Sequence, residues 1–293
     1  MKIGVSSYCF WQEMQAGRMD IVQAIGEIAE MGGEHAEIVP LGFDLARNPE
    51  LIEAIRTKAS EVGIEISNYA IGANFAGLDG QAYEQEIGRV KREVDIAAAL
   101  GVKLMRHDVA SSVDRSIRQF ANDLPKLAEA CRTIADYAAQ YGITTSVENH
   151  GYYIQASDRV QALINEVGRD NFRTTLDIGN FVCVDENPVV AVRNNIPYAS
   201  MVHIKDFYIR SESCDPGEGW FKSAGGSYLR GAIVGHGDLD IRSALRIVRD
   251  SGYDGYLSIE FEGMEPCVNA TKLALNNVRR LWKQCESNGR SEE

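Results

Sequence analysis

The stretch Thr144-Thr145-Ser146-Val147-Glu148-Asn149-His150-Gly151 joins a β-branched run to a carboxylate, an amide and an imidazole. β-branched residues favour strands, and burying three such polar groups at a strand end is costly unless they are paired or used. Three later stretches finish in the same way, at Thr174–Asn180, Met201–Asp206 and Leu257–Glu262. Because the ends of parallel barrel strands open on one rim, the sequence predicts that these polar groups converge there.

A repeated unit runs through the chain, in which an amphipathic helix closes at a glycine and a short strand follows. Gly63 and Gly101 hold this closing position, where glycine adopts positive φ without strain. Strands alternating with helices at a spacing of about 35 residues predict a parallel sheet with right-handed crossovers. We expect eight strands and a final helix, at residues 2–8, 35–39, 64–71, 102–107, 143–148, 173–178, 200–205 and 255–261, and 268–286.

Eight such units predict an α/β fold of the (βα)8 TIM barrel type, as a single domain over residues 1–286. A doubly wound open sheet is the alternative, but no G-x-G-x-x-G motif opens the first helix. Residues 207–238 are rich in Gly and Ser and lack helical periodicity, so we expect a long loop after the seventh strand, acting as a lid. Residues 287–293 are polar, and we expect a frayed C-terminal tail.

Composition narrows the range of partners. The 293 residues carry a net charge of −12 and no basic run, which argues against nucleic acid. The six cysteines form no C-x-x-C pair, so reduced thiols are expected. The first residues do not read as a signal peptide, and no apolar run approaches the length of a membrane span. We therefore expect a cytoplasmic protein that acts on a small molecule without membrane contact; the sequence leaves open whether it forms an oligomer.

Four residues at the predicted rim suit one divalent ion: Glu148, Asp177, His203 and Glu260. Three carboxylates and an imidazole repel one another when left alone, so a cation is their natural partner. Oxygen-rich ligation with one His and no thiolate favours Mn²⁺, with Mg²⁺, Co²⁺ and Zn²⁺ as alternatives. Each residue also has a structural alternative: an ion pair for Glu148, a turn cap for Asp177, a core histidine for His203. Glu262 competes with Glu260, because residues two apart on a strand share a face.

The motifs V-E-N-H-G, L-D-I-G-N, H-I-K-D and G-Y-x-G-Y-L-S-I-E-x-E-G, with G-x-G-D-L-D at Gly235–Asp240, extend the pattern. With these motifs the chain resembles the sugar phosphate isomerase/epimerase family of the xylose isomerase-like TIM barrel superfamily. The resemblance covers nearly the whole chain and is strongest over 143–265. It implies a TIM barrel whose metal ligands are Glu148, Asp177, His203 and Glu260, and it implies that Glu148 and Glu260 are the catalytic acid/base pair.

Other residues near the predicted rim are candidates for binding substrate. Many relatives carry His where this chain has Asn180, which puts that usual substrate contact in doubt, and no phosphate-binding cluster is evident. Arg106 and Asp108 are expected to form an ion pair with each other. The candidates for substrate binding are His107, His150, Asn180, Lys205, His236 and Trp11.

These residues predict a metal-dependent sugar isomerase or epimerase. A metal that bridges a carbonyl and the adjacent hydroxyl would acidify the C–H bond and stabilise a cis-enediolate, between one glutamate that removes the proton and another that returns it. The nearest alternative is a lyase or dehydratase that acts on a keto-sugar or inosose by β-elimination, with Lys205 and the long loop favouring it. A DNA-repair endonuclease needs more His ligands and a basic groove, so it ranks lower, as does a non-catalytic sugar-binding barrel.

Overall fold

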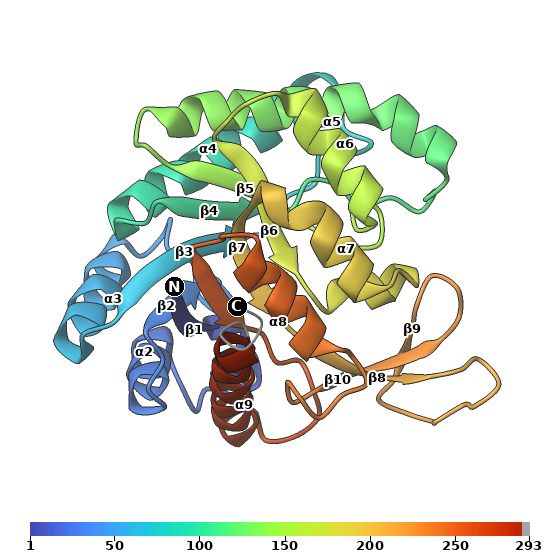
Figure 1. Cartoon of the computed structure of the whole chain (residues 1–293). Helices are drawn as coiled ribbons and strands as arrows, with labels where there is room; N and C mark the ends of the chain where they lie inside the picture. Colours follow the sequence, from blue (N-terminus) through green and yellow to red (C-terminus); the bar gives the residue numbers. More distant parts are fainter. Residues whose placement is uncertain (289–293) are drawn as a thin grey trace.

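The computed structural model describes residues 1–288, and in it eight parallel strands close into a single barrel, as the sequence predicts (Figure 1). Strands adjacent in the barrel follow chain order except at the seam, where the last strand pairs with the first and Leu257 lies opposite Ile3. Every barrel strand overlaps a predicted one. The barrel strands are β1 (Lys2–Ser6), β2 (His35–Ile38), β3 (Glu65–Ile71), β4 (Leu104–His107), β5 (Thr144–Glu148), β6 (Phe172–Asp177), β7 (Ala199–Ile204) and β11 (Tyr256–Ile259).

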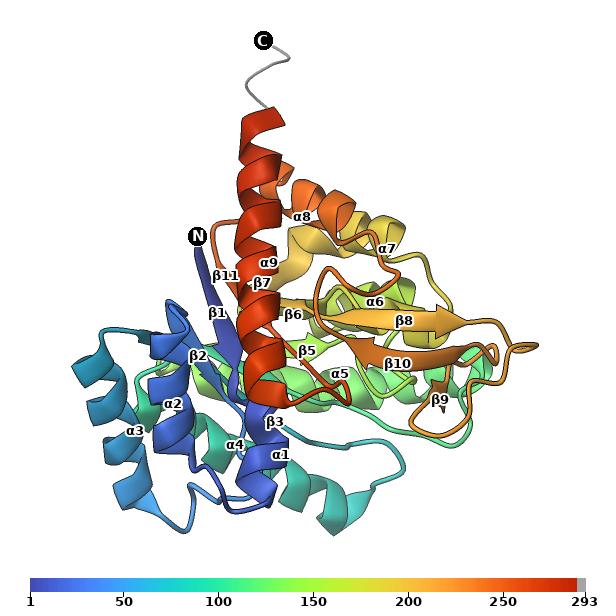
Figure 2. The same cartoon turned by 90° about the horizontal axis from the view of Figure 1, so that it is seen from below.

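Helices surround the barrel, and the last of them lies beside β1 at the seam (Figure 2). It ends at Asn288, beyond the predicted end at 286, and the remainder of the predicted tail lies outside the described residues. The α-helices are α1 (Trp11–Gln15), α2 (Ile21–Glu30), α3 (Pro49–Val62), α4 (Gly80–Leu100), α5 (Ile117–Ala139), α6 (Ser157–Val167), α7 (Pro188–Asn195), α8 (Ile241–Asp250) and α9 (Cys267–Asn288), and the 3-10 turns are η1 (Ser7–Phe10), η2 (Asn180–Val184) and η3 (Ile196–Tyr198).

Local sequence signals set the helix ends. The Asp20 carboxylate accepts a hydrogen bond from Gln23 N, and the Gln23 side chain accepts one from Asp20 N, which forms a capping box at the start of α2. At their C-terminal ends, α3 and α4 stop at Gly63 and Gly101, with φ of 73° and 80°. These are the positions where the repeat predicts a glycine, so each strand begins a fixed few residues after its helix.

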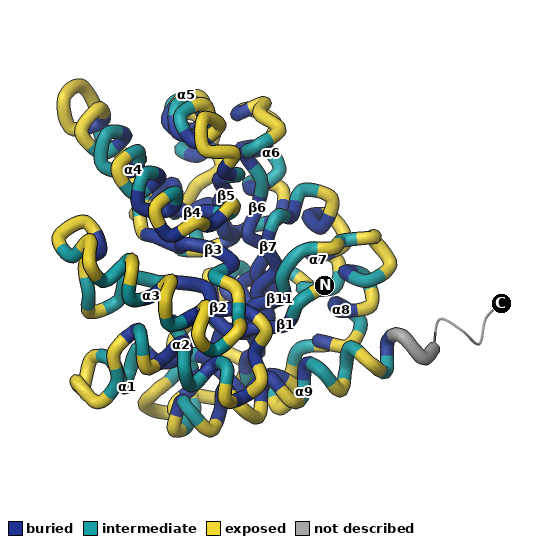
Figure 3. Tube along the Cα trace, turned by 90° about the vertical axis from the view of Figure 1, so that its left-hand side faces the viewer, coloured by how far each residue is buried: buried dark blue, intermediate teal, exposed yellow. Residues whose placement is uncertain are grey.

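The core lies in the barrel interior and between the strands and helices. Figure 3 shows the strands as buried and the outer faces of the helices as exposed. Val5, Ile38 and Val147 are almost completely buried. All six cysteines are free thiols, as expected. Within residues 1–288, no helix has the length and apolar character needed to cross a membrane.

The segment after β7 differs from its prediction. In place of a long loop without regular structure, it forms a three-stranded antiparallel sheet of β8 (Asp206–Arg210), β9 (Phe221–Lys222) and β10 (Tyr228–Ala232), which projects from one side of the barrel (Figure 1). Phe207 and Leu229 on one face of this sheet pack against η2. Each strand is short, and the intervening Gly and Ser residues obscure the alternation that creates this apolar face.

Candidate metal centre and active site

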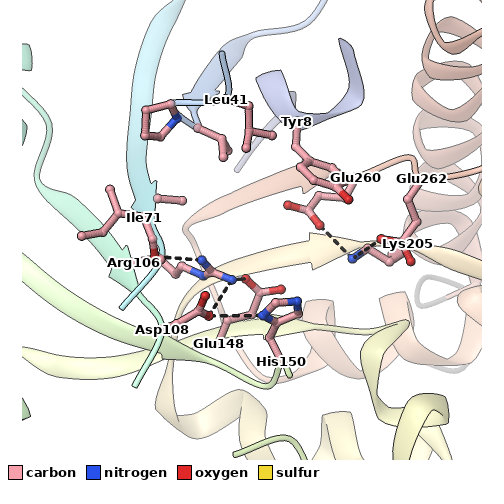
Figure 4. A pocket seen from close by; sticks show the side chains of 14 residues that line it. Tyr8, Leu41, Ile71, Arg106, Asp108, Glu148, His150, Lys205, Glu260 and Glu262 are labelled. Atoms are coloured by element: carbon pink, nitrogen blue, oxygen red, sulfur yellow. Dashed lines mark hydrogen bonds and ion pairs between the residues drawn. The ribbon is translucent and has the colours of Figure 1, made fainter. Parts of the chain in front are cut away.

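A cavity of about 270 Å³ opens at the C-terminal ends of the barrel strands. Figure 4 shows its polar lining in two groups: Glu148 lies with Arg106 and Asp108, and Glu260 lies with Lys205. Both glutamates occupy strand ends, since Glu148 is the last residue of β5 and Glu260 directly follows β11. The cavity is near the lower limit of about 300 Å³ for typical ligand pockets, so it suits a small ligand.

Glu148, Asp177, His203 and Glu260 are brought together as predicted. Each offers a ligand atom, and these atoms all lie within 4.8 Å of one another. All four residues are buried, and they come from the ends of four different strands. The cluster is therefore assembled by barrel closure and not by any local turn.

Two atoms of this cluster fit a cation particularly well. His203 Nδ1 and Asp177 Oδ2 are both buried and take part in no hydrogen bond among the described residues, although Asp177 Oδ2 has an ion-pair partner in Lys205 Nζ at 3.2 Å. His203 Nδ1 lies 3.4 Å from Glu260 Oε1 and 3.7 Å from Glu148 Oε1, so it faces two carboxylates. Three oxygen donors and one nitrogen donor match the preferences of Mn²⁺ and Mg²⁺. The residues present thus fit a divalent ion.

Glu37 fixes the orientation of the His203 ring. Its Oε2 accepts a hydrogen bond from His203 Nε2 at 2.8 Å, and Asn68 Nδ2 donates to Glu37 Oε1 at 3.0 Å. Glu37 is completely buried in β2, across the barrel from β7. A carboxylate on Nε2 leaves Nδ1 as the free ring nitrogen, which is the usual support for a histidine that binds a metal.

The electrostatics of the cluster reflect crowded carboxylates. Burial raises the pKa of Asp177 to about 6; Lys205 opposes this shift, while Glu148 and Glu260 add to it. Burial would lower the pKa of His203, but the carboxylates of Glu37 and Glu260 hold it well above its usual range. In the absence of a cation the imidazole therefore carries a proton, and metal binding would release that proton.

Lys205 lies on the Glu260 side of the cavity. Its Nζ is 2.9 Å from Glu260 Oε2, 3.2 Å from Asp177 Oδ2 and 3.4 Å from Glu262 Oε2. Burial would lower its pKa, yet these carboxylates raise it well above the ordinary value, so the ammonium stays charged. Tyr8 lines the same side, and burial raises the pKa of its phenol to about 12, which keeps it a neutral donor.

Arg106 occupies the Glu148 side. Its Nη2 lies 2.7 Å from Glu148 Oε2 and 3.0 Å from Asp108 Oδ1, so the expected ion pair with Asp108 is present and is joined by Glu148. Burial would raise the pKa of Glu148, but Arg106 and His203 hold it well below its usual range. His150 is half-exposed, and its Nδ1 lies 3.2 Å from Asp108 Oδ1.

The predicted substrate-binding residues divide into two groups. Lys205 and His150 line the cavity. Asn180 lies immediately beneath, where its Nδ2 donates to Glu148 Oε1 at 3.0 Å and its Oδ1 accepts from Lys205 Nζ at 3.3 Å. The other three candidates do not line this cavity. His107 is buried between the rings of Phe75 and Phe172, His236 is exposed in a turn after β10, and Trp11 is half-buried at the start of α1.

Sequence reasoning missed Glu37, Tyr8 and an apolar wall. The wall is formed by Val39, Pro40 and Leu41 after β2 together with Ile71 at the end of β3. Glu37 had a signal, because it is a lone carboxylate within the apolar run Ala36-Glu37-Ile38-Val39. Tyr8 and Leu41 had none, because their orientation depends on the turns that follow β1 and β2.

Comparisons with known proteins agree with the barrel fold. A sequence model of the family described as "Xylose isomerase-like TIM barrel" matches residues 25–284. An inosose dehydratase from Lacticaseibacillus casei is 23% identical over 219 residues, which cover 70% of this chain and 73% of that protein. The solved structure of an L-ribulose 3-epimerase superposes with a TM-score of 0.74 at 16% identity, covering 100% of this chain and 98% of the other.

A third relative is a xylose isomerase-like TIM barrel protein from Mycobacterium smegmatis, solved in complex with magnesium. It superposes with a TM-score of 0.72 at 20% identity, covering 98% of this chain and 97% of the other. At these identities the structural likeness supports the barrel fold, while the chemistry of this chain has to be argued from its own residues.

Proposed function

This chain belongs to the xylose isomerase-like TIM barrel family, and from that membership and its site we propose that it is a metal-dependent sugar isomerase or epimerase. The family processes sugars, which makes a small carbohydrate the substrate class. Glu148, Asp177, His203 and Glu260 would hold one divalent ion, with Mn²⁺ as our first choice. Bound there, the ion would polarise a substrate carbonyl and acidify the adjacent C–H bond.

One observation carries the proposal: Glu148 and Glu260 line the same cavity from different strands, each beside its own cation (Figure 4). A reaction that removes a proton and returns it to the other face of the same carbon needs two such groups. Lys205 and His203 hold the pKa of Glu260 below its ordinary value against the effect of burial, as Arg106 does for Glu148. Either carboxylate is thus ionised and able to accept the proton.

One glutamate would take the proton from the carbon, and the other, protonated from solvent, would return one. The Lys205 ammonium, 2.9 Å from Glu260 Oε2, keeps its proton and would stabilise negative charge that develops on the substrate oxygen beside it. Delivery to the original carbon from the opposite side gives the epimer, and delivery to the neighbouring carbon gives the isomer. The apolar wall with Leu41 and Ile71 shields the carbanion-like intermediate from bulk water.

Hydrogen exchange tests this proposal. The protein is incubated with Mn²⁺ and a panel of ketohexoses in D₂O, and deuterium at each carbon is read by NMR. We expect deuterium at C3 for epimerisation or at C1 for isomerisation, lost in Glu148→Gln and Glu260→Gln. The control is Glu65→Gln at the opposite end of the barrel. Absence of exchange with every ketose would refute the proposal.

A lyase is the second candidate, favoured by Lys205. An ammonium 2.9 Å from Glu260 is placed to protonate a departing hydroxyl after Glu260 or Glu148 removes the α-proton. The likeness to an inosose dehydratase supports the same reaction class. Incubation with a keto-cyclitol separates the two: elimination releases water and gives a conjugated ketone that absorbs in the ultraviolet, whereas epimerisation gives deuterated isomers without new absorbance.

A further inference from the structure

The site holds more negative charge than a divalent ion neutralises. Two cations, Arg106 and Lys205, face six carboxylates in and beneath the cavity. The carboxylates are Glu37, Asp108, Glu148, Asp177, Glu260 and Glu262. With a divalent ion bound, the six carboxylates exceed the positive charge of the ion, Arg106 and Lys205 by two.

Both cations are already occupied. Arg106 donates to the Ile71 carbonyl at 3.0 Å in addition to its ion pairs with Glu148 and Asp108. Lys205 is shared among three carboxylates within 3.4 Å and the Asn180 amide. An anionic substrate group would have to displace one of these buried carboxylates from its partner, which leaves a buried charge unpaired and is costly.

The remaining walls offer no charge either. Val39, Leu41 and Ile71 form an aliphatic surface that suits the C–H face of a ring. Tyr8 and His150 offer hydrogen bonds at the cavity surface, and among the described residues no hydrogen bond to the Tyr8 phenol competes for it. Such a combination matches a molecule with hydroxyls on its edges and no ionised group.

We propose that this site selects an uncharged polyhydroxylated ketone, such as a free ketose or a keto-cyclitol, and rejects its phosphate esters and carboxylates. The inference rests on the proposed function, because the ketone is the group that the acid/base pair requires. It goes beyond that function by assigning specificity to the excess of carboxylates, with Glu262 and Asp108 as the residues that exclude anions.

Calorimetric titration of the Mg²⁺-loaded full chain tests the inference without turnover. The probes are D-fructose and D-fructose 1-phosphate, because a phosphate on C1 next to the carbonyl has to enter the cavity, while one on C6 can extend into solvent. We expect the phosphate ester to bind at least about 30-fold more weakly, given the strength of unscreened charge interactions in partly buried sites. Equal or tighter binding of the phosphate ester, or no measurable binding of any uncharged ketone in the panel, would overturn the inference.

Charge-removing variants locate the cause. Glu262→Gln and Asp108→Asn are each expected to reduce the discrimination by about tenfold, and Glu65→Gln is expected to leave it unchanged. If neither Glu262→Gln nor Asp108→Asn reduces the ratio of the two dissociation constants, these residues do not exclude anions. The deuterium assay distinguishes this inference from the proposed function. Exchange confined to phosphorylated ketoses would contradict the selectivity for uncharged ketones and would leave the proposed isomerase or epimerase activity standing. Selective binding of free ketones without exchange or elimination would contradict the proposed activity and would leave the selectivity standing.

Discussion

The two ends of the barrel treat charge in opposite ways. At the N-terminal end, Glu65 is half-exposed, and its pKa is lowered by hydrogen bonds from Lys2 and Tyr256. Glu65 is thus paired and also accessible to water. At the C-terminal end, Glu37, Glu148 and Glu260 are buried within one network.

The two ends differ in how much free energy their charged groups cost the folded state. Exposed ion pairs such as Lys2–Glu65 contribute little to stability, about 0–1 kcal/mol. A buried excess of carboxylates costs far more unless a cation compensates it. At the C-terminal end, therefore, a bound cation would stabilise the buried carboxylates, whereas Glu65 at the N-terminal end is already paired and solvated.

The largest effect on activity is expected from the removal of either candidate acid/base carboxylate at the C-terminal end, compared with the removal of a carboxylate at the N-terminal end. Under the proposed function, Glu148→Gln and Glu260→Gln would each remove an anionic metal ligand and a proton acceptor, so we expect at least a thousandfold loss of deuterium exchange. Glu65→Gln, the matched change at the other end, should alter the rate less than twofold. Retention of more than a tenth of the activity in both site variants would show that these residues are not the acid/base pair.

Loss of the charge behind His203 should have a smaller effect, on metal binding. Glu37→Gln removes the anion that accepts from Nε2, and we expect metal affinity to fall about 10–100-fold, with activity recovering at saturating metal. The dissociation constant from competition with a chelating dye provides the measurement. Glu34→Gln, an exposed carboxylate bonded to Ile3 N, serves as control. Unchanged affinity in Glu37→Gln would remove Glu37 from the metal site.

Low pH should destabilise the folded barrel, because two buried histidines are neutral in the folded state. Burial lowers the pKa of His35 and His107 to about 4, against about 6.5 when unfolded. As the pH falls below 6.5, these two histidines therefore bind protons in the unfolded chain but not in the folded chain. Stability is full above pH 6.5 and falls as the pH drops toward 4, by on the order of 2 kcal/mol for each histidine between pH 7 and 5.

Urea unfolding at a series of pH values checks this. In His107→Gln the pH slope of the unfolding free energy should be smaller over this range than in the unsubstituted protein. Equal slopes in the two proteins would mean that His107 is protonated in the fold.

The smallest effect is expected at the β8–β10–β9 sheet. Tyr152 Oη donates to the Lys222 carbonyl at 2.9 Å, which ties this sheet to the loop after β5. None of the described residues lining the cavity comes from 206–238. Tyr152→Phe should therefore cost about 1 kcal/mol of stability and leave kcat/KM within twofold. A drop of tenfold or more would support the lid role predicted for this segment.

The barrel could be predicted from the sequence because its signals are periodic. Helices such as α3, α4 and α6 end at a glycine and a strand follows within a few residues, and eight such repeats leave little choice of fold. The convergence of the candidate metal ligands could also be predicted, because Glu148, Asp177 and His203 lie at the ends of their strands. Closure of the barrel then brings them together without any detail of the loops.

Other features of the site could not be predicted, because the direction in which a side chain points depends on the three-dimensional structure. Arg106 and His107 are neighbours on β4, but Arg106 points into the cavity while His107 packs among Phe75 and Phe172. Tyr8 lines the site in place of Trp11 because a 3-10 turn follows β1 and redirects the chain. Glu37 stands out in the sequence as a lone carboxylate in an apolar run, but its role depends on His203, which is 166 positions away and lies across the barrel.

Titration of the apoprotein with Mn²⁺, with free Mn²⁺ followed by electron paramagnetic resonance, tests the central claim most directly. We predict one saturable site per chain, lost in Asp177→Asn and retained in Glu65→Gln. We also predict that protons are released on binding, because His203 gives up the proton that its carboxylate neighbours stabilise. The absence of saturable binding, or a site that survives Asp177→Asn unchanged, would contradict the assignment of this cluster as a metal centre.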